Sequence, residues 1–212
     1  MIKTKEVRWF FKEDKKAIRS WFESQGMDLF HQREDLYLQL DSENVGVKLR
    51  EGLVEIKHRV GNRARGQLIC DKSGYFEKYI KWSLNADEHD PTVAEILQGD
   101  MERWVSVNKA RWAVLIVENN GELEQRPLTY EADCGYQIEY TKVHVYDCEW
   151  YTFGVEWFGN RLLEPDTAMM SDIIEDTTLN MKDSLGYAEF LKRLNPERKG
   201  CQVLEETVHN GF

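Results

Sequence analysis

The residues best placed to do chemistry are charged side chains on a hairpin between residues 46 and 60. Five charged residues alternate there with apolar ones: Lys48, Arg50, Glu55, Lys57 and Arg59. Side chains on a strand point alternately to its two faces, so the charges share one face and the apolar residues share the other. A two-residue bend at Glu51-Gly52 sets Lys48 opposite Glu55. The chemistry of this face depends on whether it looks at solvent or into a cavity.

The same alternation places charge on one face of further segments that are otherwise apolar or aromatic. The basic residues with this placement, hairpin included, are Arg8, Lys48, Arg50, Lys57, Arg59, Lys81, Lys109 and Arg111. The acidic ones are Glu6, Glu55, Glu139 and Glu156. The chain has a net charge of −10 and a pI of about 5.1, so an ordinary solvated face should be mixed or acidic. A concentration of cations in such a chain indicates a site for a polyanion.

Like charges at this density need compensation. Two cations about 6 Å apart repel by roughly 3 kcal/mol at an effective dielectric constant near 20. Several such pairs inside a barrel require carboxylates or a bound anion between them. Phosphate oxygens suit the remaining charge, because arginine binds them through a two-pronged fork and lysine binds them as a point charge. The sequence therefore predicts a small phosphorylated anion as the partner.

Eight segments alternate as strands do and are expected to form a mostly antiparallel sheet. They cover roughly 5–11, 35–40, 46–51, 53–60, 75–84, 106–117, 136–146 and 150–158. Closing such a sheet into a barrel removes its edges and encloses an interior whose residues alternate with outward ones. The predicted fold class is α+β, mostly β: an eight-stranded antiparallel closed barrel, or tunnel, with helices packed on the outside.

Three helices are expected to cover apolar outward faces of this barrel. The first lies near 13–25, with Asp14 as its N-cap. The second follows Pro91, and the third lies near 184–194. The stretch 61–73 is predicted to be a polar loop.

Length and composition narrow the class of protein. The 212 residues, 42% of them hydrophobic, suit one domain over 1–212, with a core of about 5–160 and a helical segment of about 165–195. The sequence has no run of 18 apolar residues and no signal-peptide-like start, which predicts a cytoplasmic protein without membrane contact. The acidic balance argues against general nucleic-acid binding. The oligomeric state stays open, a homodimer included.

Seven charged motifs follow one another over residues 5–160: Arg33-Glu34-Asp35-Leu36-Tyr37-Leu38, Gly46-Val47-Lys48-Leu49-Arg50-Glu51-Gly52, Glu55-Ile56-Lys57-His58-Arg59, Lys81-Trp82-Ser83, Val107-Asn108-Lys109-Ala110-Arg111, Ile138-Glu139-Tyr140-Thr141 and Thr152-Phe153-Gly154-Val155-Glu156. Their order and spacing resemble those of the CYTH-like, or triphosphate tunnel, family. The resemblance implies an eight-stranded tunnel that binds triphosphate, polyphosphate or another phosphorylated metabolite.

The resemblance also implies roles for individual residues. In active members, basic side chains hold the phosphates, and glutamates hold Mg²⁺ or Mn²⁺ for reactions such as tripolyphosphate hydrolysis. Carried onto this chain, the phosphate ligands would be Lys48, Arg50, Lys57, Arg59, Lys81, Lys109 and Arg111, and Arg8 in the altered first strand is predicted as an eighth. The metal ligands, or braces for the basic residues, would be Glu6, Glu55, Glu139 and Glu156.

The first strand departs from the family pattern Glu-x-Glu-x-Lys. It reads Glu6-Val7-Arg8-Trp9-Phe10, so Arg8 replaces a glutamate and Phe10 replaces the lysine. Divalent cations need several oxygen ligands, and a cation in place of a carboxylate repels them. Three hypotheses follow. The chain is a metal-dependent phosphohydrolase, a catalytically silent protein that binds or senses a phosphorylated ligand, or an interaction protein whose charges only pair across strands, at about 0.2–1 kcal/mol each.

Overall fold

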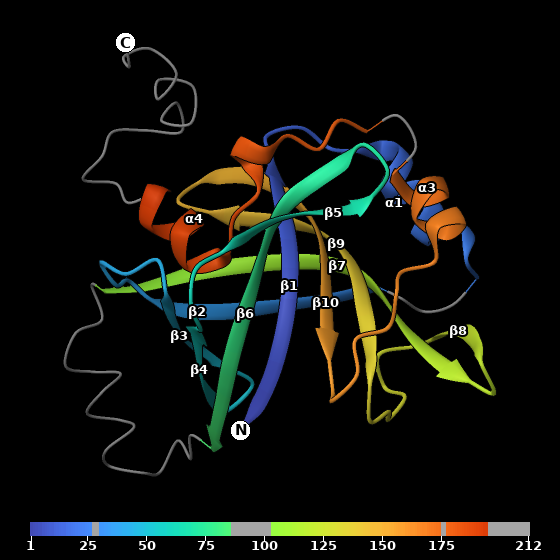
Figure 1. Cartoon of the computed structure of the whole chain (residues 1–212). Helices are drawn as coiled ribbons and strands as arrows, with labels where there is room; N and C mark the ends of the chain where they lie inside the picture. The colour runs from blue at the N-terminus through green and yellow to red at the C-terminus, as the bar shows by residue number, and fades with distance from the viewer. Residues whose placement is uncertain (27–29, 86–102, 175–176, 195–212) are drawn as a thin grey trace.

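A computed structural model describes residues 1–26, 30–85, 103–174 and 177–194 (Figure 1). Its strands are β1 (Ile2–Phe11), β2 (Phe30–Leu38), β3 (Val45–Arg50), β4 (Leu53–Arg59), β5 (Ala64–Ile69), β6 (Lys72–Asn85), β7 (Trp104–Asn119), β8 (Glu122–Arg126), β9 (Gly135–Val145) and β10 (Cys148–Phe158). Its helices are α1 (Lys16–Ser24), α3 (Thr167–Ile174) and α4 (Tyr187–Leu194), with a 3₁₀ turn, η2 (Met181–Asp183), before α4.

Eight of these strands form a closed antiparallel barrel. Neighbours follow the order β1-β10-β9-β7-β2-β3-β4-β6, and β6 pairs with β1 to close the ring. The predicted fold class is confirmed, and each of the eight predicted strands is a barrel strand. β5 and β8 were not predicted. β5 lies in the stretch 61–73, which was expected to be a loop. Its sequence does not alternate as a strand does, and it is a strand because it pairs with the long strand β6.

The charged hairpin has the predicted register. Lys48 lies opposite Glu55, and Leu49 lies opposite Val54. Glu51 and Gly52 at the bend have φ values of 49° and 73°. Two consecutive positive φ angles give the tight turn whose twist matches the two flanking strands, and glycine accepts such an angle without strain.

The first helix differs from the prediction in its N-cap, and α3 lies in the predicted helical segment of 165–195 but was not one of the three expected helices. The N-cap of α1 is the residue after Asp14, and no side chain caps the helix. Asp14 instead accepts a hydrogen bond from the Tyr140 hydroxyl at 2.8 Å and pairs with Arg19, so its carboxylate is engaged by side chains. The third predicted helix corresponds to α4. The helix expected after Pro91 lies outside the described residues.

The outer and inner faces of the barrel carry different cores. The outer face of β1, β7, β9 and β10 packs beneath α1, α3 and β5, with apolar side chains such as Trp9, Ile138 and Phe153 fully buried. Inside the barrel, a second apolar cluster fills one end. It contains Phe10, Val107, Val143 and Trp150 from the strands, and Phe190 and Leu191 from α4. Helix α4 therefore seals that end of the barrel interior.

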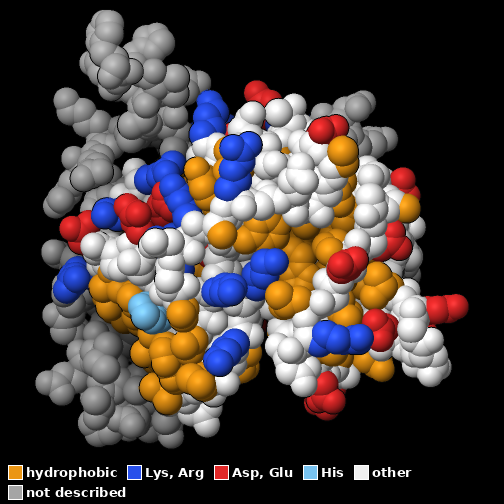
Figure 2. Space-filling view, in the orientation of Figure 1, with side chains coloured by type: hydrophobic (Ala, Val, Ile, Leu, Met, Phe, Trp, Pro, Cys, Tyr) orange, Lys and Arg blue, Asp and Glu red, His pale blue; other side chains and the backbone are white. Residues whose placement is uncertain are grey.

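The remaining outer face is partly apolar and open to solvent. Trp82 and Leu84 on β6 are 38% and 58% exposed, opposite Ile56 and Val54 on β4. Figure 2 shows hydrophobic side chains gathered on the face where β4 and β6 lie in Figure 1. Within the described part of the chain, no helix combines the length and apolar character needed to cross a bilayer.

Candidate functional site

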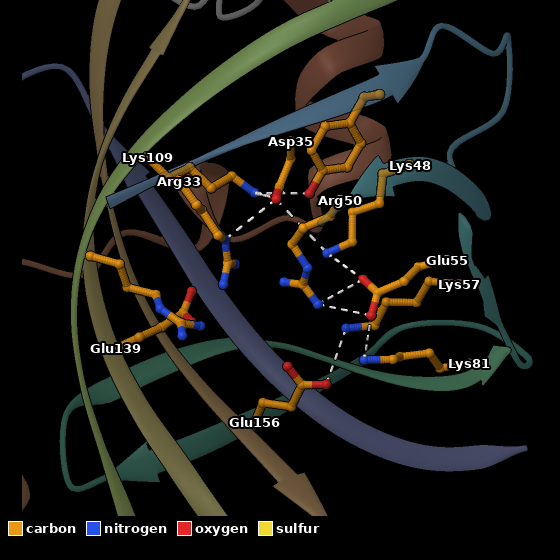
Figure 3. Close-up of polar contacts among 12 residues, drawn as sticks. Arg33, Asp35, Lys48, Arg50, Glu55, Lys57, Lys81, Lys109, Glu139 and Glu156 are labelled. Atoms are coloured by element: carbon orange, nitrogen blue, oxygen red, sulfur yellow. Dashed lines mark hydrogen bonds and ion pairs between the residues drawn. The ribbon is translucent and has the colours of Figure 1, made fainter. Parts of the chain in front are cut away.

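The inward faces of the strands line a cavity of about 180 Å³. Its charged lining residues are Glu6, Arg8, Arg33, Lys48, Arg50, Glu55, Lys57, Lys81, Lys109, Arg111, Glu139 and Glu156. Figure 3 shows side chains from different walls of the barrel pointing toward one another. Residues two apart on a strand share a face, so Lys109 and Arg111 on β7 both point inward. The barrel thus gathers charges from eight strands in one space.

Glu55 and its three cations form the first group, called here the Glu55 cluster. The Glu55 carboxylate lies 2.7 Å from Lys48 Nζ, 2.8 Å from Arg50 Nη2 and 2.9 Å from Lys81 Nζ. Burial alone would raise the pKa of Glu55, but the neighbouring cations outweigh burial and hold that pKa well below its usual value. Glu55 is therefore ionised, and its cluster keeps a surplus of positive charge.

Asp35 and its partners form a second group deeper in the barrel. Lys109 Nζ lies 2.7 Å from Asp35 Oδ2 and donates to Tyr37 Oη at 2.9 Å, while Arg33 Nε lies 3.4 Å from Asp35 Oδ1. Burial alone would raise the pKa of Asp35, but Lys109 and its neighbouring cations hold it at about 2. Burial lowers the pKa of Lys109 well below its usual value and that of Lys48 to about 8.

Glu139 joins two arginines on the opposite wall. It accepts hydrogen bonds from Arg8 Nη1, from Arg111 Nη1 at 3.4 Å and from Gln137 Nε2 at 2.8 Å. Gly154 faces Arg8 across β1 and β10, and a Cβ added there would stand 3.0 Å from Arg8 Cζ. The missing side chain lets the Arg8 guanidinium lie against the β10 backbone, where it also donates to Thr152.

Lys57 has the opposite arrangement to Glu55: one ammonium lies between two carboxylates. This Lys57 cluster places Lys57 Nζ 2.6 Å from Glu6 Oε2 and 3.3 Å from Glu156 Oε1. Burial alone would lower the pKa of Lys57, but the two glutamates outweigh it and raise the pKa above its usual value. Lys57 and Glu156 each keep 28% of the side chain exposed, so the cavity reaches solvent near them.

The charges of the cavity do not balance. Eight cationic side chains line it against four carboxylates, and the buried Asp35 beneath them is a fifth. With every basic side chain protonated, the described interior therefore holds three more positive than negative charges. Several donors also lack partners: Arg8 Nε, Arg33 Nε, Arg111 Nε and the Thr141 hydroxyl are buried without a hydrogen bond. Unpaired buried donors cost free energy unless a ligand satisfies them.

Most of the predicted site residues come together here. Of the eight predicted phosphate ligands, seven line the cavity; Arg59 lies outside the lining, where its guanidinium binds Glu77 and Asn44. All four predicted metal-binding glutamates line it. Sequence reasoning missed Arg33, Asp35, Tyr37, Gln137 and Tyr187. Arg33, Asp35 and Tyr37 share one face of β2, but polar neighbours weaken the alternation before residue 35, where the strand was predicted to begin.

The carboxylates of the cavity are occupied by basic side chains and do not form a site for a divalent metal. Within the described ranges, no three His, Cys, Asp or Glu side chains converge as metal ligands would. Lys57 contacts Glu6 and Glu156, three cations contact Glu55, and two arginines contact Glu139. Mg²⁺ and Mn²⁺ require several oxygen ligands with uncompensated charge. The residues present therefore do not fit such an ion.

The fold and cavity together define a closed antiparallel barrel with a cationic interior, an architecture compatible with a tunnel-like ligand-binding domain. In comparisons with known proteins, no family model matches the sequence, and no curated protein matches it either.

Proposed function

We propose that the barrel binds a compact, phosphate-rich anion such as triphosphate, the end of a polyphosphate chain or a phosphorylated metabolite. The observation that carries this proposal is the surplus of three positive charges in an interior whose carboxylates are already paired. Such a surplus is costly in a low-dielectric space, and a multivalent anion would relieve it.

The size and chemistry of the cavity support a small, highly charged ligand. At about 180 Å³ the cavity is smaller than the pockets of ~300–1,000 Å³ that hold drug-sized molecules. Its donors are mostly charged, and they include four arginines: Arg8, Arg33, Arg50 and Arg111. Each planar guanidinium group can bind two phosphate oxygens at once, whereas a lysine contributes a single point charge. One end is sealed by α4, so the ligand would enter from the side where Lys57 and Glu156 meet solvent.

Calorimetric titration of the full chain with tripolyphosphate tests the proposal. We expect saturable binding and a thermal stabilisation of about 2.7 kcal/mol at a ligand concentration of one hundred times Kd. The variant Lys81→Ala should weaken binding, because it removes one of three cations on Glu55 and leaves the other two. Lys78→Ala is the matched control: it lies on the same strand but is exposed and does not line the cavity.

The outcomes separate the three hypotheses. No binding of tripolyphosphate by the unmodified chain, or equal losses in both lysine variants, would contradict an anion site in the barrel. Phosphate release assayed with Mg²⁺ or Mn²⁺ distinguishes a hydrolase from a binding protein. Release that Lys81→Ala reduces and Lys78→Ala does not would identify turnover in this cavity.

A further inference from the structure

Three glutamates lie side by side on the inner face of neighbouring barrel strands, two of them in the cavity lining. Glu6 on β1 pairs directly with Glu156 on β10 and with Glu77 on β6. Directly opposed residues of adjacent strands have Cβ atoms about 4.5–5.5 Å apart, so like charges there repel. Glu6 and Glu77 are only 4% and 2% exposed, which leaves water little role in separating them. Neighbouring cations are therefore needed to offset the repulsion between these carboxylates.

The chain supplies those cations itself. Lys57 reaches from β4 and places its ammonium within hydrogen-bond range of Glu6 and Glu156, at 2.6 and 3.3 Å. Arg59, two residues further along β4, binds Glu77. Arg8 on β1 reaches across β10 and binds Glu139 on β9. Each carboxylate in this part of the cavity thus has a basic side chain as its counter-ion.

The position of each counter-ion is built into the fold. The Lys57 ammonium also lies over the Tyr79 ring, 4.6 Å from its centre, and this cation–π contact helps to position it. Arg8 occupies space that exists only because position 154 is glycine, since a Cβ there would stand 3.0 Å from its Nη1. Thr152 accepts a second hydrogen bond from Arg8 at 3.2 Å. These contacts hold the cations in place whether or not an anion is bound.

From this arrangement we infer that Lys57 and Arg8 are resident counter-ions that take the place of a divalent metal. A metal ion entering the row would have to displace a cation already bound to two carboxylates, and it would add charge to an interior with a positive surplus. The barrel accordingly binds its anion without Mg²⁺ or Mn²⁺ and excludes both ions from its carboxylates. The statement about the anion rests on the proposed function; the statement about metal exclusion does not.

Manganese titration followed by electron paramagnetic resonance tests the metal statement directly. The full chain without anion should bind no Mn²⁺ in the micromolar range. Lys57→Met keeps the length of the side chain but removes its charge, which leaves Glu6 and Glu156 to face each other, while Glu77 keeps Arg59. This variant should bind Mn²⁺ at least tenfold more tightly than the unmodified chain.

The matched control is Lys81→Met, which removes a cation from the same cavity but leaves Glu55 with two others. It should bind Mn²⁺ no better than the unmodified chain. Should Lys57→Met fail to fold, Arg8→Met provides the second variant, because it leaves Glu139, beside the row, with Arg111 as its one remaining arginine partner. Micromolar Mn²⁺ binding by the unmodified chain, or no gain in any folded variant that lacks Lys57 or Arg8, would overturn the inference.

The anion statement is tested by titrating the full chain with tripolyphosphate in a chelator and again with Mn²⁺ at matched free anion. Equal affinity is expected. Binding that needs the metal would overturn the inference and leave the proposed function standing. No binding in either condition would remove the proposed function, while the manganese titrations would still decide whether the resident cations exclude a metal.

Discussion

The Glu55 and Lys57 clusters lie two residues apart on β4 and have opposite compositions. Glu55 is one carboxylate among three cations, whereas Lys57 is one cation between two carboxylates. Each central residue is held by an excess of the opposite charge, so each is firmly ionised. The difference between them is the charge left over, positive around Glu55 and negative around Lys57. An anion should therefore be drawn toward the Glu55 cluster, while the Lys57 cluster mainly holds the wall together.

The strongest test of this contrast is Glu55→Gln. The change removes the carboxylate shared by Lys48, Arg50 and Lys81 and leaves only Asp35, 3.9 Å from Lys48; Glu55 is only 3% exposed in the folded chain. Breaking a buried ion pair from one side costs about 3–5 kcal/mol. We expect a loss of that size in the free energy of unfolding, measured by urea denaturation.

A multivalent anion should reverse much of that loss, because it can replace the missing carboxylate. Tripolyphosphate should accordingly stabilise Glu55→Gln more than it stabilises the unmodified chain. Equal stabilisation of both proteins would argue against an anion bound beside these three cations.

Lys57→Met should be destabilising in a pH-dependent way. Without the ammonium, Glu6 and Glu156 face each other, and such a pair raises the pKa of one carboxyl in the folded state. The folded chain then holds a proton that the unfolded chain has released, so stability falls as pH rises above the ordinary carboxyl range. The deficit relative to the unmodified chain should grow by about 1.4 kcal/mol for each unit by which the pKa is raised.

Thermal melts of both proteins at pH 5 and pH 8 measure this effect. A deficit that stays constant between the two pH values would show that Lys57 does not neutralise the pair. Lys142→Met serves as the control, because Lys142 is an exposed cation paired with one exposed glutamate on the outer wall.

Arg33→Ala should affect binding and leave folding nearly unchanged. The Arg33 side chain is 16% exposed and lies 3.4 Å from Asp35, which keeps its bond to Lys109. Losing one charged hydrogen bond to an anion costs about 1.5–3 kcal/mol, so tripolyphosphate should bind at least tenfold more weakly. Calorimetry gives the affinity, and a melt gives the stability. A large fall in melting temperature without a change in affinity would assign Arg33 a structural role.

The parts of this site that could be predicted are those that depend on neighbours along the chain. Strict alternation and a two-residue bend placed Lys48 and Glu55 on the same inward face, and the structure confirms their register. Arg33 was missed because polar residues occupy both faces at the start of β2, so alternation there is weak. Its place is specified by pairing with Lys109 on β7, 76 residues later.

The remaining differences between the predicted and the observed site come from contacts between segments that are far apart in the chain. Arg59 lies on the predicted face of β4, but β6 brings Glu77 within its reach, and it lies outside the cavity lining. Tyr187 enters the cavity from α4, whose sequence shows only an amphipathic helix. Contacts between segments that are far apart in the chain have no signature in a single sequence, and these contacts determine which charges meet.

The smallest expected effect is the pH dependence of anion binding, and it distinguishes the two clusters. Burial lowers the pKa of Lys48 in the Glu55 cluster to about 8, while Lys57 keeps its proton because its pKa is raised. An anion binds the protonated form of Lys48 better, so affinity should fall as pH rises through about 8, by at most tenfold per unit. Trimetaphosphate suits this titration, since its own charge does not change between pH 7 and pH 9.5. Lys48→Gln should bind it more weakly at pH 7 and with no change in affinity around pH 8. An equally steep profile in Lys48→Gln would place the titrating group elsewhere, and unchanged affinity at pH 7 would remove Lys48 from the anion's contacts.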